Sequence, residues 1–170
     1  RRRARGFRQD MLRTLHALLA YPSINPTPDG LSEATVAALR FAVAEAGRLG
    51  LAARNLNDLA GYAELGPADA PETVGVLAHL DVVPAGDGWT HDPFAGVVAD
   101  GAIWGRGTED DKGPAVAALY AMRALADLGV PLSRRVRLVF GTNEEQGNWI
   151  GVQHYAAREG APTMGFTPDG

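Results

Sequence analysis

The sequence predicts an α/β fold in which helices cover a layered sheet. Segments whose apolar residues recur at helical spacing alternate with short strand-like runs, which is the pattern of such a fold. Residues 73–78 are nearly all apolar, and residues 135–141 hold a run of Val, Leu and Phe, as strands covered on both faces do. The 170 residues, 46% hydrophobic and 21% charged, suffice for one domain that buries roughly 70% of its extended-chain surface.

The first part of the chain is predicted to hold two amphipathic helices. Apolar residues recur at helical spacing from Phe7 to Leu19, and a proline-, glycine- and asparagine-containing loop follows over residues 24–30. The second helix is predicted over residues 33–49, with Ser32 as its N-cap and Gly50 at its end.

Strands dominate the middle and the end of the chain. The predicted strands are residues 51–56 paired with 62–65, 73–78, the hairpin 95–98 with 102–104, 135–141 and 163–167. Two later helices are predicted over residues 112–128 and 150–158.

Composition excludes several classes of protein. The net charge of −4 gives no reason to expect nucleic acid or an anionic membrane as a partner. No apolar segment reaches the roughly 18 residues of a membrane span. The absence of cysteine excludes disulfides and thiolate metal sites, so His, Asp and Glu must supply any metal ligands. We expect a cytoplasmic protein.

The two ends of the sequence suggest a piece of a longer chain. It begins with Arg1, and the basic run that follows, which includes Arg8, is expected to be a solvated helix terminus. It stops at Gly170, directly after the strand-like run 163–167 and without a closing helix. We therefore expect part of a larger domain.

The first chemical motif is His79-Leu80-Asp81, at the end of the strand 73–78. Side chains at positions i and i+2 of a strand point the same way. A metal-binding histidine usually donates its other N–H to a carboxylate, and Asp81 is placed to accept it. A structural His followed by a turn-forming Asp is the alternative for this common pattern.

Residues 105–114 combine a glycine-rich loop with Glu109, Asp110 and Asp111 at the start of a predicted helix. The backbone of such a loop could bind phosphate or a nucleotide. Three consecutive acidic side chains would repel phosphate and favour a divalent cation. The acids could also serve only the helix dipole, although that role does not explain the glycines.

Further acidic residues follow two other predicted strands. Glu144 and Glu145 come after the strand 135–141, and Asp169 comes after the strand 163–167. Taken alone, a glutamate pair is usually solvated and one Asp in a turn is common. Open α/β sheets, however, bind ligands beyond the carboxyl ends of their strands, where these residues should meet.

Convergence of these acids on His79 would create strong repulsion. Two like charges 4 Å apart repel by about 4 kcal/mol at an effective dielectric of 20. Cations or several protons would have to offset that repulsion. Divalent metal ions do so most directly, and the sequence therefore predicts a metal site.

Together these motifs resemble the two-metal (zinc) metallopeptidase family of carnosinases, aminoacylases, carboxypeptidase G and succinyl-diaminopimelate desuccinylase. The connecting segment 89–94 and the closing segment 165–169 are most similar to its PepV-type bacterial dipeptidases. The resemblance implies a zinc-peptidase-like catalytic domain with a mixed, largely parallel sheet flanked by helices. Residues 1–170 would be its N-terminal part, without the lid or dimerisation domain and the C-terminal part. The matching residues run from Val74 to Gly170 and comprise His79-Leu80-Asp81, Gly105-Arg106-Gly107-Thr108, Asp110-Asp111-Lys112-Gly113, Gly141-Thr142-Asn143-Glu144-Glu145 and Pro168-Asp169.

The resemblance implies a set of metal ligands. His79 and Asp169 would bind the first metal and Glu145 the second. Asp110 would bridge both metals, with a cis peptide bond to Asp111. Two zinc ions are expected, with manganese or cobalt as alternatives.

The resemblance also implies catalytic roles. Glu144 would be the general base, and Asp81 would orient the imidazole of His79. The residue before the glutamate pair is usually Asp in relatives. We interpret Asn143 as a change beside the site, not as the loss of a ligand.

The implied reaction is hydrolysis of the amide bond of a dipeptide. Two metals about 3.5–4 Å apart would share a water and lower its pKa to about 7. Glu144 would take its proton and return it to the leaving amine. Relatives draw a second-metal His and an oxyanion-stabilising His from later parts of the chain, and His91 and His154 come too early to replace them. The fragment itself is therefore expected to be inactive.

Two other functions remain open from the sequence. An N-acyl amino acid deacylase of the same family would use the same reaction class on a different substrate. A non-catalytic metal-binding module would need the ligands only, and the presence of Glu144 argues against it.

Overall fold

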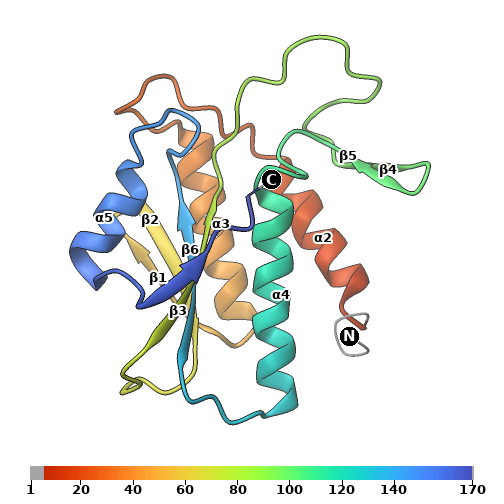
Figure 1. The fold of residues 1–170 in the computed structure, drawn as a ribbon. Coiled ribbons are helices and arrows are strands. Elements are labelled where there is room, and N and C mark those ends of the chain that lie inside the picture. Colours follow the sequence, from red (N-terminus) through yellow and green to blue (C-terminus); the bar gives the residue numbers. More distant parts are fainter. Residues whose placement is uncertain (1–5, 170) are drawn as a thin grey trace.

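The computed structural model describes residues 6–169 and has a five-stranded sheet with helices on both faces (Figure 1). The predicted α/β fold class is confirmed. Arg1, Arg2, Arg3 and Arg5 of the basic run lie outside the described residues, as does Gly170. In chain order the elements are α2 (Arg8–Leu19), α3 (Glu33–Arg48), β1 (Ala52–Leu56), β2 (Ala60–Leu65), β3 (Thr73–His79), β4 (Val97–Ala99), β5 (Ala102–Trp104), α4 (Lys112–Leu128), β6 (Arg135–Gly141), α5 (Ile150–Glu159) and β7 (Met164–Phe166).

The main sheet has the strand order β1-β2-β6-β3-β7 and is mixed. The pairs β1–β2 and β2–β6 are antiparallel, whereas β3 runs parallel to both β6 and β7. Asn57 and Asp58 make the tight connection between β1 and β2, with φ of 58° and 61°. Asn and Asp tolerate this left-handed conformation, which suits a hairpin turn. Antiparallel pairing therefore has a larger share of the sheet than the sequence led us to expect.

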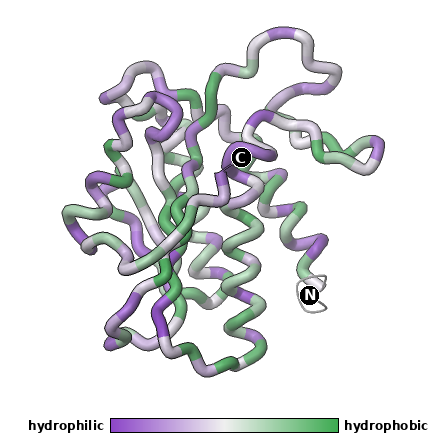
Figure 2. The backbone as a smooth tube through the Cα atoms, viewed as in Figure 1, coloured by the Kyte–Doolittle hydropathy of each residue, from purple (hydrophilic) through white to green (hydrophobic). Residues whose placement is uncertain are grey.

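Side chains of β6 alternate between two hydrophobic cores. Leu138 and Phe140 pack into the larger core beneath α2, α3 and α4. Val139 points to the other face, where it packs with Tyr62 of β2 and Tyr155 of α5. The alternation follows from the two-residue period of a strand. Along the chain, hydrophobic stretches follow the central strands and hydrophilic stretches occupy many connections (Figure 2).

Most predicted boundaries agree with the structure within two residues. Ser32 caps α3 as expected, because its Oγ accepts a hydrogen bond of 3.1 Å from the backbone N–H of Thr35. The small hairpin begins at Val97, two residues later than expected, and β4 pairs only with β5. Within residues 6–169, no helix is long and apolar enough to cross a membrane.

The parallel pairing of β3 and β6 positions the carboxyl ends of both strands side by side. His79, the last residue of β3, pairs with Gly141, the last residue of β6. The connection that follows each strand therefore leaves the sheet at the same edge. Residues 80–83 and residues 142–149 meet there, and the residues before α4 approach the same edge.

Replacement of Leu138 by Ala tests the larger core. Leu138 is 0% exposed on the central strand, so the substitution should lower the free energy of unfolding by about 2–5 kcal/mol. Leu128 at the end of α4 is 58% exposed, and Leu128→Ala should change the free energy of unfolding by less than about 0.5 kcal/mol. Chemical denaturation measures both values. Equal effects of the two substitutions would contradict this assignment of the core.

Candidate metal centre

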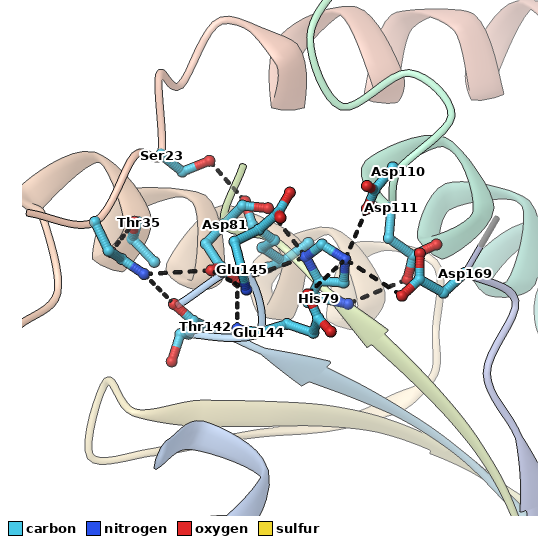
Figure 3. A network of polar contacts seen from close by, with 12 residues as sticks. Ser23, Thr35, His79, Asp81, Asp110, Asp111, Thr142, Glu144, Glu145 and Asp169 are labelled. Atoms are coloured by element: carbon cyan, nitrogen blue, oxygen red, sulfur yellow. Dashed lines mark hydrogen bonds and ion pairs between the residues drawn. The ribbon is translucent and has the colours of Figure 1, made fainter. Parts of the chain in front are cut away.

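His79 lies at the middle of a group of carboxylates (Figure 3). Its side chain is 4% exposed, and its Nε2 atom is 2.9 Å from Oδ1 of Asp110. The same nitrogen is 3.9 Å from Oε2 of Glu144 and 3.9 Å from Oδ2 of Asp169. The three carboxylates come from the segment before α4, the segment after β6 and the segment after β7. The structure thus brings three separate motifs to one imidazole.

Glu145 completes the group from the other side. Its Oε1 accepts a hydrogen bond of 3.2 Å from the backbone N–H of Val83. Two sets of residues have potential ligand atoms that all lie within 4.8 Å of one another. One set is His79, Glu144 and Asp169, and the other is His79, Asp110 and Glu145. The first set includes Glu144, which the resemblance makes the general base, so proximity alone does not separate the base from the ligands.

Asp81 has a wider structural role than the sequence predicted. The Nδ1 atom of His79 is 3.0 Å from the backbone carbonyl oxygen of Asp81 but 3.5 Å from its carboxylate. The carbonyl is therefore the nearer partner that orients the ring. The carboxylate, fully buried, accepts hydrogen bonds of 3.1 Å from the backbone N–H groups of both Glu144 and Glu145. Asp81 thus holds the backbone that carries the glutamate pair.

The glycines before α4 allow the loop to fold tightly around the helix start. Gly107 has a φ of +89°, which L-residues with side chains rarely adopt. A Cβ atom on Gly113 would lie 1.9 Å from the carbonyl oxygen of Thr108, so no side chain fits there. The peptide bond between Asp110 and Asp111 is cis, as the resemblance implied. These features account for a glycine-rich loop without a phosphate ligand.

Asp111 and Lys112 are buried next to this site. Oδ2 of Asp111 accepts a hydrogen bond of 3.2 Å from the backbone N–H of His79. Nζ of Lys112 donates one of 2.7 Å to the carbonyl oxygen of Tyr21. Both side chains are 0% exposed. The sequence did not predict a supporting role for either residue; Asp111 ends the acidic run 109–111 and Lys112 follows it.

The pKa values reflect crowding of negative charge. Burial opposes protonation of His79, but hydrogen bonding and attraction from Asp81, with further attraction from Asp111 and Asp110, outweigh it and raise its pKa to about 9. Burial raises the pKa of Asp111 to about 7, although His79 opposes the shift. Burial also raises the pKa of Glu144, with added repulsion from Asp169. In the absence of a metal, the protonated forms of His79, Asp111 and Glu144 are thus favoured relative to the same side chains in water.

Two buried atoms test whether these residues fit a metal. Within residues 6–169, neither Nε2 of His79 nor Oδ1 of Asp110 makes a hydrogen bond, although they are 2.9 Å apart. Unsatisfied buried polar atoms are rare in folded proteins, and a bound ion is one cause. One imidazole nitrogen with several carboxylate oxygens is a ligand set that suits zinc or manganese. The residues present therefore fit a divalent cation.

Asn143 departs from the expected pattern and lies deep in the protein. It is 1% exposed, and within the described chain neither Nδ2 nor Oδ1 of its amide has a hydrogen-bond partner. It belongs to neither of the two candidate ligand sets. Its interpretation as a change beside the site stays a prediction.

Several known proteins are similar to this chain. Over 120 residues it is 50% identical to the candidate dipeptidase YtjP of Bacillus subtilis, which covers 71% of this chain and 25% of that protein. Over 160 residues it is 41% identical to a candidate dipeptidase of Staphylococcus haemolyticus, which covers 91% of this chain and 34% of that protein. The chain therefore spans about a quarter to a third of the length of these relatives.

Structural similarity extends over nearly the whole chain. The structure of human carnosine dipeptidase 1 matches with a TM-score of 0.80 and 26% identity, over 98% of this chain and 40% of that one. The sequence model of peptidase family M20/M25/M40 matches residues 75–169, which is more than half of the chain and includes all four motifs. This chain belongs to peptidase family M20/M25/M40.

Proposed function

We propose that the protein containing this chain is a two-metal dipeptidase that hydrolyses the amide bond of its substrate. The observation that carries the proposal is the convergence of Asp110, Glu144 and Asp169 on Nε2 of one buried histidine, with Glu145 alongside. The similarity to candidate dipeptidases supports a dipeptide as substrate.

The proposed ligands are His79, Asp110, Glu145 and Asp169. Their unsatisfied or charged atoms lie close together, so negative charge is crowded at this site. Two bound zinc ions, or manganese or cobalt in their place, would supply an activated water and polarise the scissile carbonyl. The metal identity is part of the proposal.

Glu144 is proposed as the general base. Its carboxylate is partly exposed, with 27% of the side chain accessible, so a water and a substrate can reach it. Burial and the charge of Asp169 raise its pKa, and a more basic carboxylate is a better proton acceptor. The backbone of Glu144 is fixed by Asp81. Glu144 would take a proton from water and deliver it to the leaving amine.

We also propose that residues 1–170 form the N-terminal part of a larger catalytic domain. The share of 25% to 40% that the chain covers in its relatives supports this proposal. A cavity of about 390 Å³ beside the site, with partly exposed Trp149, Met164 and Phe166 in its lining, is compatible with further chain packing there. Residues 1–170 alone would then be inactive. The cytoplasm is the proposed compartment.

Three alternatives differ from this proposal in substrate, in chemistry or in ligand. An N-acyl amino acid deacylase would share the ligands and base, so assays of the full-length protein with dipeptides and with N-acyl amino acids distinguish it. A non-catalytic metal-binding module would bind zinc but hydrolyse neither substrate. Equilibrium dialysis against zinc and against a nucleotide tests the phosphate-binding alternative, and we expect zinc alone to bind.

Replacement of Glu144 by Ala in the full-length protein tests the proposed base. We expect kcat for a dipeptide to fall by about 10²–10⁴-fold while bound zinc is retained, because the substitution removes the proton acceptor. Glu109→Ala is the matched control, since Glu109 is an exposed acid beside Asp110. Kinetics and metal analysis give both values. An active Glu144→Ala enzyme would refute the assignment of the base.

The pH dependence of zinc binding tests the role of His79. A protonated imidazole cannot bind metal, and below a pKa of about 9 its neutral fraction rises about tenfold per pH unit. The zinc affinity of the metal-free protein should therefore rise about tenfold from pH 7 to pH 8, as measured by competition with a chelator. His154→Gln should leave this slope unchanged. An affinity independent of pH would show that no proton leaves on binding.

A further inference from the structure

The loop between α2 and α3 contacts three of the four sequence motifs, although the family match begins only at residue 75. The carbonyl oxygen of Tyr21 accepts the hydrogen bond from Lys112. Ser23 Oγ donates one of 2.6 Å to the carbonyl oxygen of Leu80, and the N–H of Val82 donates one of 3.0 Å to the carbonyl oxygen of Ser23. The loop therefore runs alongside the segment that holds Asp81.

Asn25 is the central residue of this loop and is 4% exposed. Its Nδ2 donates a hydrogen bond of 2.6 Å to the carbonyl oxygen of Thr142 and lies 3.5 Å from Oδ2 of Asp81. Its Oδ1 accepts hydrogen bonds from the N–H of Ser32, at 3.1 Å, and from Oγ1 of Thr35, at 2.8 Å. A backbone carbonyl on one side and a backbone N–H on the other fix the orientation of the amide.

The two halves of the Asn25 amide thus serve different parts of the molecule. The oxygen accepts hydrogen bonds at the start of α3, which lies outside the candidate metal centre. The nitrogen binds Thr142 and Asp81, which lie directly beside the glutamate pair. A further contact on the same side is the hydrogen bond of 3.3 Å from Nε2 of Gln146 to the backbone carbonyl oxygen of Asn25. The segment that carries Glu144 is therefore held from two directions.

This arrangement links Asn25 to the glutamates through Asp81. The carboxylate of Asp81 accepts the backbone N–H groups of Glu144 and Glu145. A carboxylate that accepts two N–H groups needs its own position fixed, and residues that orient ligands commonly change metal affinity or activity by 10–100-fold when altered. Asn25 contacts both Asp81 and Thr142, the residues on either side of this connection.

We propose that Asn25 is a positioning residue for the Glu144–Glu145 segment, acting through the donor half of its side chain. Its effect on catalysis rests on the proposed function, whereas its effect on the geometry of the segment does not. Asn25→Asp keeps an acceptor for Ser32 and Thr35 but cannot donate to Thr142, and it places a negative charge where Nδ2 now lies 3.5 Å from Oδ2 of Asp81. The neutral Asn25→Ser, too short to reach Thr142, removes the donor without adding that charge. Thr35→Val is the matched control, since it removes a partner of the acceptor half only.

Amide hydrogen exchange of Glu144 and Glu145 in the metal-free full-length protein is the test. We expect Asn25→Asp to accelerate exchange at these two amides at least tenfold, and Thr35→Val to change it less than twofold. Asn25→Ser, which also serves if Asn25→Asp does not fold, should accelerate exchange at these amides beyond the effect of Thr35→Val, and acceleration by Asn25→Asp alone would show that the added charge is the cause and overturn the proposal. Equal acceleration by the Asn25 and Thr35 substitutions, or none by either, would overturn the proposal.

Kinetics of the zinc-loaded full-length protein separate this inference from the proposed function. A positioning role predicts that the Asn25 variant loses kcat about 10–100-fold with KM within about threefold of the wild type. A fall in kcat with normal hydrogen exchange would overturn the inference. A wild-type protein that hydrolyses no dipeptide would refute the proposed function, and the exchange measurement would still decide the role of Asn25.

Discussion

Repulsion between carboxylates around one imidazole is the constraint on which this structure depends. Like charges 4 Å apart repel by about 4 kcal/mol at an effective dielectric of 20, and carboxylate oxygens of Glu144 and Asp169, like those of Asp110 and Glu145, lie within 4.8 Å of each other. The chain offsets part of this repulsion on its inner side. There Asp81 accepts two backbone N–H groups, and Asp111 accepts a third. On the outer side, Asp110 and Glu145 are proposed to bind cations that would offset the rest.

Rigid secondary structure makes the convergence tolerable. The parallel strands β3 and β6 end side by side, and α4 begins directly after the cis peptide bond at Asp110. Each acidic residue is thus carried by a short segment that leaves a fixed element. Buried backbone groups complete the support, as in the contact of Lys112 with Tyr21. The Glu144–Glu145 segment and the end of β3 cannot drift far to relieve the repulsion, because Asp81 and Asp111 accept hydrogen bonds from their backbone N–H groups.

The sequence predicted the elements and the acidic cluster better than their supports. The bounds of α4 and β6 followed from strong apolar patterns and from clear glycine and proline boundaries. The convergence on His79 followed from the rule that ligands gather at carboxyl ends of strands. The role of Asn25 could not be predicted in this way. Asn25 lies in a loop without periodicity, and its partners Asp81 and Thr142 are 56 and 117 positions later in the sequence. The contact of the Asp81 backbone carbonyl with the imidazole of His79 was not predicted for a related reason. Every residue has a backbone carbonyl, so the residue type does not indicate which one will be a partner.

Protons explain how such a cluster can exist before any metal binds. The pKa of His79, at about 9, favours the protonated imidazole at neutral pH in the metal-free protein, and burial raises the pKa of Asp111 to about 7, which favours its protonated form. These shifts reduce the net charge of the site without any change of fold. A divalent ion bound at His79, as proposed, would have to displace its proton, so the same acids that would attract the ion also favour the competing proton. The donors of the inner hydrogen bonds are backbone N–H groups and the neutral amide of Asn25, which do not titrate and so hold the geometry with or without a metal.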